Sequence, residues 1–266
     1  MNNNITTIIT LYKTPEDKLK NLKQYRSFPL FIFEQEGSIN SKKKIQNKLK
    51  RRFKYFSSDR NIGLSRATNI LFKKVKSRYL LFTQADINID QKSILSLMKI
   101  FKKNRYIIFV TPTFSKKNLN SSKKKFKYVK KIKAACILCD VKKLRKIGFF
   151  DDDYFLYWED IDLMQKINNT KFKMVVVNNI FARHESSQSS VNSIKTQYLR
   201  NSNFMYGELI FDLKHEKLRL IKIIRKLLQN LFLFFFNIIR FDIKNSVKNF
   251  SIICGILKFT LYSFKR

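Results

Sequence analysis

Acidic, aromatic and imidazole side chains gather in one segment of this chain, residues 147–185. The protein is strongly basic, with 55 Lys and Arg against 19 Asp and Glu and a net charge of +36. Seven of the nineteen acids nevertheless fall in this segment, beside one of the two histidines. They are Asp151, Asp152, Asp153, Glu159, Asp160, Asp162 and Glu185, with His184 next to the last. Carboxylates and an imidazole bind metals and move protons, so the segment predicts a site for a metal ion and a polar substrate.

Two positions upstream have the residue types that a nucleotide site needs. Asp86 follows the apolar run Tyr79–Thr83, so its carboxylate would end a buried strand, where a hard oxygen suits a divalent cation. Capping of the next turn or helix is the alternative for such an Asp. Asn61-Ile62-Gly63 forms a small-residue turn before a helix, as a loop close to a nucleotide requires, although an ordinary helix start has the same pattern.

Apolar runs and helical stretches alternate along the first two thirds of the chain. Strands are predicted at 5–12, 29–33, 53–56, 79–83, 106–110 and 174–177, with a further apolar segment at 134–138, and helices at 16–25, 64–75, 92–101 and 160–167. Residues 119–133 are rich in Lys and Ser and predict an exposed loop or hairpin, and His184 is expected on a loop. This alternation predicts an α/β fold with a mostly parallel, doubly wound sheet, whose ligands lie at the carboxyl ends of the strands.

After Asn192 the chain changes character and predicts helices at 195–213, 217–240 and 243–264. Phe, Ile and Leu alternate there with Lys and Arg, and no apolar stretch reaches the roughly 20 residues that cross a bilayer. The pattern favours amphipathic helices on an anionic membrane surface, and packing on the catalytic domain or on a second copy in a homodimer is the alternative. We therefore expect a domain at 1–213 and a basic, Phe-rich helical segment at 214–266.

The order and spacing of these motifs resemble glycosyltransferase family 2. The resemblance rests on Asn61-x-Gly63 with Asn69, on Asp86, on the stretch Gly148–Leu163, which includes Tyr157-x-Glu159-Asp160-x-Asp162, and on His184. It covers about residues 5–213, and bacterial rhamnosyltransferases of surface-polysaccharide assembly are the most similar subgroup. It implies a GT-A fold, an inverting transfer from a nucleotide-sugar, and Mg²⁺ or Mn²⁺ as cofactor.

The same resemblance implies roles for individual residues. Asp86 and His184 would bind the metal and the diphosphate of the donor. Asp160 would be the general base that deprotonates the acceptor hydroxyl, with Glu159 beside it. The remaining implied donor residues are Asn61, Gly63, Asn69, Glu34 or Glu36 at the end of the second strand, and Arg200, for which a surface position is the alternative. On the acceptor side they are Asp162, Tyr157 and Trp158, although the two aromatic residues could instead pack in the core.

The expected partners follow from the resemblance and from the charge. They are a nucleotide-sugar, a glycan or lipid-linked acceptor, and the inner face of the cytoplasmic membrane, to which the protein would bind peripherally. The competing hypotheses are a basic nucleic-acid-binding protein and an inactive GT-A scaffold, but no nucleic-acid module is recognisable and the acids cluster in one segment. Met1-Asn2-Asn3-Asn4 opens no signal-peptide pattern, and we expect the CxxC pair Cys136 and Cys139 to be buried thiols of a protein in a reducing compartment.

Overall fold

The computed structural model describes residues 4–116, 125–185 and 189–264. The Met1–Asn3 start and much of the expected loop at 119–133 lie outside these ranges. The described chain divides into two compact units, residues 1–150 with 163–191 and residues 151–162 with 192–266. The helix at 194–214, assigned above to the first domain, clusters with the two helices that follow it.

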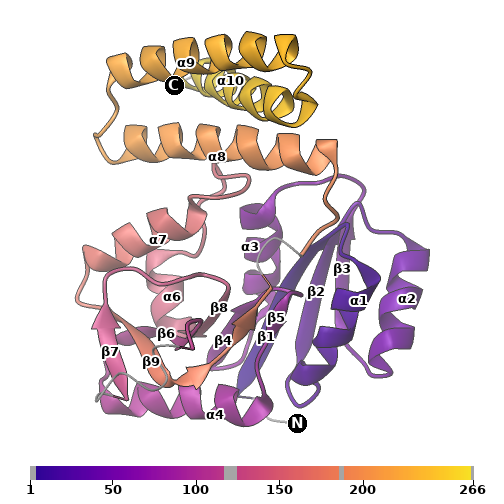
Figure 1. Cartoon of the computed structure of the whole chain (residues 1–266). Coiled ribbons are helices and arrows are strands. Elements are labelled where there is room, and N and C mark those ends of the chain that lie inside the picture. The colour runs from indigo at the N-terminus through magenta and orange to yellow at the C-terminus, as the bar shows by residue number, and fades with distance from the viewer. Residues whose placement is uncertain (1–3, 117–124, 186–188, 265–266) are drawn as a thin grey trace. The chain divides into compact units, whose positions relative to one another are not determined.

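The first unit is built on an eight-stranded sheet of order β3-β2-β1-β4-β8-β6-β9-β7 (Figure 1). Its strands are β1 Ile5–Tyr12, β2 Leu30–Gln35, β3 Lys54–Ser58, β4 Tyr79–Thr83, β6 Ile107–Thr113, β7 Phe126–Val129, β8 Cys136–Asp140 and β9 Lys173–Phe181. β1 to β4 run parallel, β8 is antiparallel to both β4 and β6, and β7 is antiparallel to β9. The carboxyl ends of β1, β2, β4 and β6 therefore share one edge, and the strand order reverses between β1 and β4, where ligands of such sheets bind.

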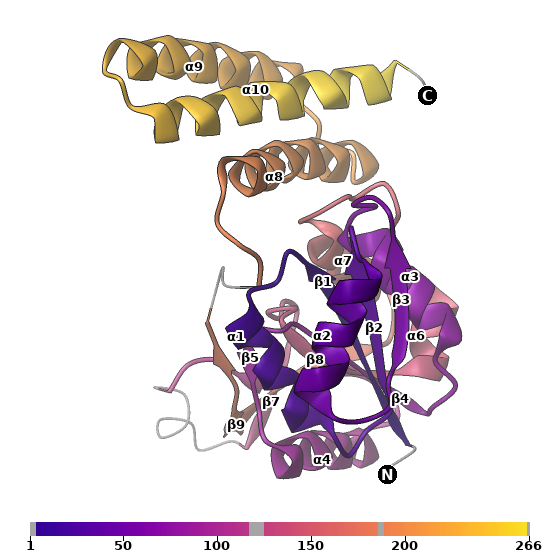
Figure 2. The ribbon, with the colours of Figure 1, turned by 90° about the vertical axis from the view of Figure 1, so that its right-hand side faces the viewer.

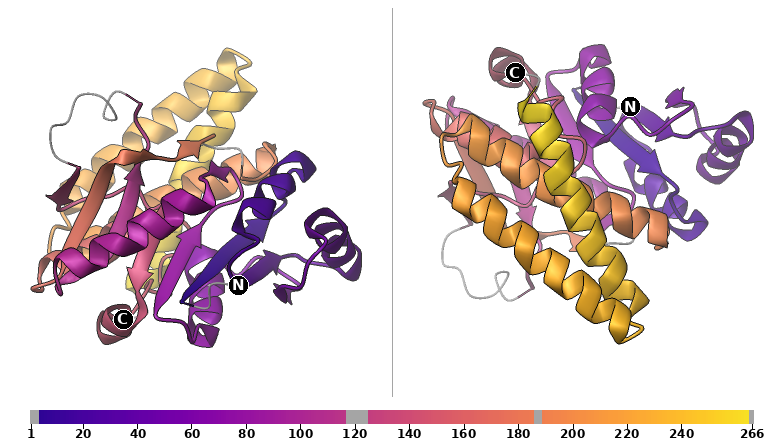
Figure 3. Two further views of the ribbon diagram at one scale, coloured as in Figure 1. Left: turned by 90° about the horizontal axis from the view of Figure 1, so that it is seen from below. Right: turned by 90° about the horizontal axis from the view of Figure 1, so that it is seen from above.

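Helices cover both faces of this sheet, as a doubly wound fold requires (Figure 2). One face packs against the 3₁₀ helix Lys20–Tyr25, α2 Ile39–Leu49 and α4 Gln91–Ile100, which the view from below shows crossing the sheet (Figure 3). The other packs against α3 Leu64–Lys74, α6 Val141–Ile147 and the end of α7 Glu159–Asn168. Cys136 and Cys139 are buried free thiols in opposite faces, which confirms their structural reading, and burial raises the pKa of the Cys136 thiol to about 12.

The structure differs locally from the predicted elements. The helix predicted at 16–25 is a short α1, Glu16–Leu19, followed by 3₁₀ geometry through Tyr25. His184 lies on a strand rather than on a loop, because β10 Arg183–His184 pairs with β5 Ile87–Asn88 in a separate two-stranded sheet. A 3₁₀ turn, Phe101–Lys103, extends α4.

The second unit contains α8 Ile194–Lys214, α9 Leu220–Ile239 and α10 Ile243–Ser263, of which α10 packs against both others (Figure 3). Lys222 and Lys226, at the start of α9, face α8, where both bind Glu208 and Lys222 also binds Asp212. The exposed side of α9 is instead mostly apolar, although Arg225 is exposed there too. Its residues follow helical spacing: Ile221, Ile224, Leu228, Phe232, Phe235 and Ile239. No helix in the described ranges is long and apolar enough to cross a membrane.

Candidate active site

Asp86 and His184 meet where the small β5–β10 sheet adjoins the end of β4. The register pairs His184 with Ile87, and the backbone N–H of Glu185 donates to the carbonyl of Asp86 over 3.1 Å. As a result His184 Nε2 lies 3.6 Å from Asp86 Oδ2. Two residues 98 positions apart in the sequence are thus held side by side at the strand edge where nucleotides bind.

The buried polar atoms of this pair fit a metal site. Asp86 is 1% exposed, and among the described residues neither of its carboxyl oxygens has a hydrogen-bond partner. His184 Nδ1 is likewise buried without a partner in the described chain. Buried polar atoms left unpaired are costly, and a divalent cation with diphosphate oxygens would satisfy the carboxylate. The described residues hold no group of three or more His, Cys, Asp and Glu that could bind a metal, so a cation at this pair would need further ligands from outside such a group.

Helix capping does not account for Asp86. The side chain that caps α4 is Asp90, whose Oδ1 accepts from the N–H of Ser93 over 2.8 Å.

Next to His184, Glu185 binds Lys18 and approaches Arg183 within 3.7 Å. These contacts fix the strand that presents His184.

The end of β2 carries the two glutamates predicted near the nucleotide. Glu34 Oε2 accepts a hydrogen bond of 2.6 Å from the Tyr55 hydroxyl, and burial together with this contact raises the pKa of Tyr55 to about 12. Glu36 has a left-handed backbone, with φ 55°, and its carboxylate lies 3.5 Å from Lys13 Nζ. A Cβ at Gly37 would come within 2.6 Å of the Tyr55 hydroxyl and 2.9 Å of Ser57 Cβ, so a side chain there would have to displace its neighbours.

The predicted loop before α3 is a tightly held turn. Gly63 has φ 89° and caps α3, while Asn61 Oδ1 accepts from its N–H over 2.9 Å. Gln35 Oε1 accepts from the N–H of Ile62 over 2.8 Å and so joins the turn to the end of β2. The Asn69 side chain donates to the carbonyl of Phe150 over 2.7 Å and accepts from the N–H of the same residue over 3.2 Å. The sequence did not indicate this structural contact.

The predicted base lies in the second unit, directly after two residues with unusual backbone geometry. Tyr157 and Trp158 have φ values of 69° and 70°, a left-handed conformation that is strained for bulky side chains. They pack on α8, where a Cβ at Gly207 would lie 3.0 Å from the Tyr157 carbonyl. Trp158 contacts Phe204 and Phe211 with ring centroids 5.7 and 5.2 Å apart, so it packs in the core of this unit.

Glu159 and Asp160 begin α7 immediately after this strained turn. Glu159 is buried, and the loss of solvation together with the nearby Asp160 carboxylate raises its pKa. Burial also raises the pKa of Asp160. Asp160 Oδ1 accepts from the N–H of Ile161, and Glu159 Oε2 is buried with no partner in the described chain. A carboxylate whose pKa is raised toward neutrality has the property that a general base needs.

Asp162 is held by two residues that the sequence analysis missed. His215 Nε2 lies 3.0 Å from Asp162 Oδ1, and the Tyr154 hydroxyl donates to the same oxygen over 3.3 Å. Asp162 is 1% exposed, so its place is in the interior of the second unit. Arg200, on α8, lies near Tyr157 and counteracts the rise that burial produces in the pKa of the tyrosine. No local sequence pattern marks His215, because its contact with Asp162 forms only when the end of α8 packs beside the start of α7.

Part of the chain matches the model of a known protein family. Residues 35–163, slightly less than half of the chain, match the model described as glycosyl transferase family 2. Solved glycosyltransferases have similar architecture. The fold is GT-A. A search of curated protein sequences finds no match.

Three structures illustrate the GT-A likeness. GalNAc-T7 with UDP, GalNAc and Mn²⁺ is 14% identical with TM-score 0.56, covering 68% of this chain and 43% of its own. The mannosyltransferase PcManGT from Pyrobaculum calidifontis, with GDP-Man and Mn²⁺, is 11% identical with TM-score 0.58. The match covers 78% of this chain and 64% of the mannosyltransferase. Residues 1–349 of S. aureus TarS are 11% identical with TM-score 0.53, covering 99% and 92%. This chain therefore spans less than two thirds of the first two proteins, and these likenesses show its fold.

Proposed function

We propose that this protein is an inverting glycosyltransferase. It moves a sugar, such as rhamnose or another hexose, from a nucleotide-sugar to a hydroxyl of a glycan or lipid-linked glycan. The observation that carries the proposal is the pair Asp86 and His184, whose unpaired buried atoms suit a metal and a diphosphate. The family match over 35–163 and the Mn²⁺ and nucleotide-sugars named with similar folds support the same reading.

In this proposal the residues divide into a donor side and an acceptor side. Asp86 and His184 would hold Mg²⁺ or Mn²⁺, which would neutralise negative charge on the leaving diphosphate. Glu34, Glu36 and the turn at Asn61–Gly63 lie at the ends of β2 and α3, where the nucleoside would bind. Asn69 supports this side indirectly, through its contacts with Phe150.

On the acceptor side, Asp160 removes the proton from the attacking hydroxyl at its carboxylate, while Glu159 keeps the surroundings polar. Tyr157 would face the acceptor, and Trp158 and Asp162 hold the segment in place. Arg200, which lies near Tyr157, would contact a phosphate of the donor. An attack from the face opposite the leaving diphosphate inverts the anomeric carbon, and this displacement needs one base rather than a protein nucleophile.

We also propose that the exposed apolar face of α9 binds an anionic membrane surface at the inner face of the cytoplasmic membrane. A water-soluble helix normally turns its charges outward, whereas α9 directs Lys222 and Lys226 toward acids of α8. The net charge of +36 complements anionic lipid. A lipid-linked acceptor would then be reached without leaving the membrane.

A donor-binding and transfer assay tests the enzymatic proposal. Asp160→Asn should lower the transfer rate by about 10²–10⁴ while leaving nucleoside diphosphate binding intact, because the base acts on the acceptor. Asp152→Asn, an exposed neighbour in the same acidic segment, is the matched control and should retain activity. If the wild type neither binds nor hydrolyses any donor from a panel of nucleotide-sugars with Mn²⁺ or Mg²⁺, the proposal is wrong.

A further inference from the structure

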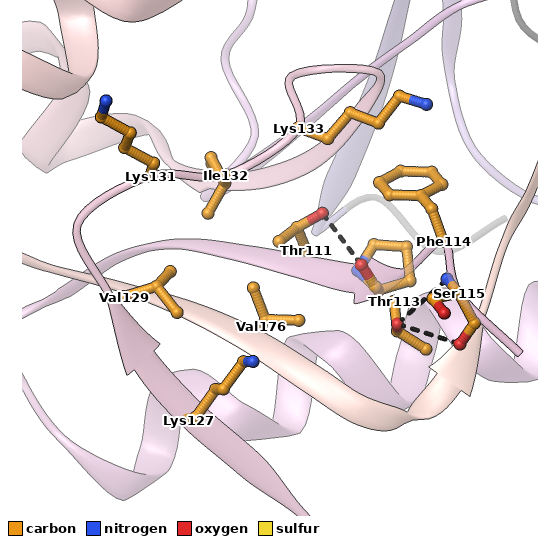
Figure 4. Close-up of a pocket in the computed structure, with 11 residues that line it drawn as sticks. Thr111, Thr113, Phe114, Ser115, Lys127, Val129, Lys131, Ile132, Lys133 and Val176 are labelled. Atoms are coloured by element: carbon orange, nitrogen blue, oxygen red, sulfur yellow. Dashed lines mark hydrogen bonds between the residues drawn. The ribbon is translucent and has the colours of Figure 1, made fainter. Parts of the chain in front are cut away.

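A pocket of about 490 Å³ lies in the first unit, between the end of β6, strand β7 and the segment that leads into β8 (Figure 4). Three lysines line it: Lys127, Lys131 and Lys133. Val129, Ile132 and Val176 provide apolar walls between them. None of the residues predicted above for the donor or the acceptor belongs to this lining.

The lining sets the charge of a suitable ligand. All three lysines are exposed to solvent, and the described residues that line the pocket include no Asp or Glu. Ammonium groups gathered around a concave apolar wall raise the local concentration of anions. The hydroxyl-bearing Thr113 and Ser115 at one side add hydrogen-bonding groups. The chemistry fits a phosphate attached to an apolar chain or a sugar ring.

The pocket adjoins the Asp86–His184 pair through Phe114. Phe114 lines the pocket, and its ring centroid lies 6.0 Å from that of His184. Lys133 Nζ lies 5.3 Å from the centroid of the same ring. A ligand held at the Lys133 end of the pocket would therefore be separated from His184 by the ring of Phe114, so the pocket lies beside the place proposed for the donor diphosphate.

We propose that this pocket binds the phosphate of the acceptor, which makes the acceptor a phosphate-bearing molecule. The inference rests on the proposed function, because it names the class of acceptor for the same reaction. Two sources share this chemistry: a lipid phosphate, whose chain would lie along Val129 and Val176, and a phosphate within an anionic glycan.

The test measures binding to the full chain in EDTA, so that metal-dependent binding at Asp86 and His184 does not contribute. Farnesyl phosphate represents the lipid source and glucose 1-phosphate the glycan source, with farnesol as the uncharged counterpart. The double variant Lys127→Gln with Lys131→Gln should bind farnesyl phosphate at least tenfold more weakly than the wild type. Lys102→Gln with Lys103→Gln, two exposed lysines at the end of α4 outside the pocket, removes the same charge and should change little.

The outcomes separate the two sources and the two proposals. A loss confined to farnesyl phosphate assigns a lipid phosphate, and a similar loss for glucose 1-phosphate assigns a glycan phosphate. Equal losses in the two double variants, or farnesol bound as tightly as farnesyl phosphate, overturn the inference. UDP and GDP binding with Mn²⁺ is measured in parallel, so a failure of the glycosyltransferase proposal appears there and not in the phosphate titration.

Discussion

His215 Nε2 lies 3.0 Å from Asp162 Oδ1, and this contact ties the first turn of α7 to the end of α8. Asp162 follows the proposed base by two residues, and Tyr154 donates to the same carboxyl oxygen. The ring of His215 also lies over Phe211, with centroids 4.3 Å apart. The second histidine of the chain thus positions the acidic turn.

Removing His215 should weaken the fold and displace the base. His215→Ala leaves the buried Asp162 with fewer partners, which costs about 1–3 kcal/mol in the free energy of unfolding. Urea unfolding measures that loss, and the transfer rate should fall with it. His215→Gln, whose amide can still donate, should restore part of both. Unchanged stability in His215→Ala would mean that the contact does not support α7.

Removing either member of the Asp86–His184 pair should weaken metal-dependent nucleotide binding. Asp86→Ala and His184→Ala each remove a predicted ligand of the cation, so titration of UDP or GDP with Mn²⁺ should show a clear loss of affinity. His215→Ala is the control for a histidine outside the pair and should bind the nucleotide normally. Equal nucleotide affinity with saturating Mn²⁺ in wild type and Asp86→Ala would show that the assignment is wrong.

Glu159 should make the protein less stable as the pH rises. Burial and Asp160 raise the pKa of Glu159 in the folded state above its ordinary value of 4.5, so the folded state keeps a proton that the unfolded state has lost. The free energy of unfolding then falls as the pH rises from 4.5 through the folded-state pKa. Glu159→Gln should reduce this slope, which urea unfolding at pH 5.5 and pH 8 measures. An identical slope in the variant would contradict the raised pKa.

Gly255 should tolerate no side chain, because α10 crosses α8 closely at this point. A Cβ there would lie 2.4 Å from the carbonyl oxygen of Ser202, and backbone cannot yield as a flexible side chain can. Gly255→Ala should therefore cost about 1–3 kcal/mol in thermal unfolding, the range for overpacking. Cys254→Ala, one position earlier, is the control and should cost less. A stable Gly255→Ala would show that the two helices can separate without penalty.

Several strands of the sheet could be predicted from the sequence, whereas the helix α2 and the strand that carries His184 could not. β1 and β4 match their predicted bounds because each is a run of β-branched and apolar residues that is buried along most of its length. α2 went unrecognised because only Ile45 and Leu49 are buried in a Lys-rich helix, which leaves little apolar periodicity. β10 is two residues long and depends on pairing with β5, so no local pattern could place His184 on a strand.

The acidic segment shows the same limit. Its composition predicted a site, but composition does not specify the left-handed turn at Tyr157 and Trp158, which depends on packing against Gly207 of α8. The contacts that distinguish Asp162 from Asp160 come from Tyr154, eight positions earlier, and from His215, 53 positions later. Residue types along the chain could therefore suggest which carboxylates matter, while their individual surroundings required the tertiary structure.

Exchanging the exposed phenylalanines of α9 should release the protein from membranes. Phe232 and Phe235 are 68% and 60% exposed, so Phe232→Ser with Phe235→Ser removes apolar surface without opening a core. Truncation is a poorer test, because α10 packs against α8. We expect the wild type to sediment with anionic liposomes, more weakly at high salt, and the variant to remain largely in solution.

Ile39→Ser with Ile194→Ser, which changes two exposed apolar residues outside α9 and α10, is the matched control for this experiment. It should sediment as the wild type does, because neither position belongs to the exposed face of α9. Sedimentation velocity without lipid provides the alternative reading. If the α9 variant binds liposomes normally but loses a dimer that the wild type forms, the apolar face joins two copies of the chain and the membrane proposal fails.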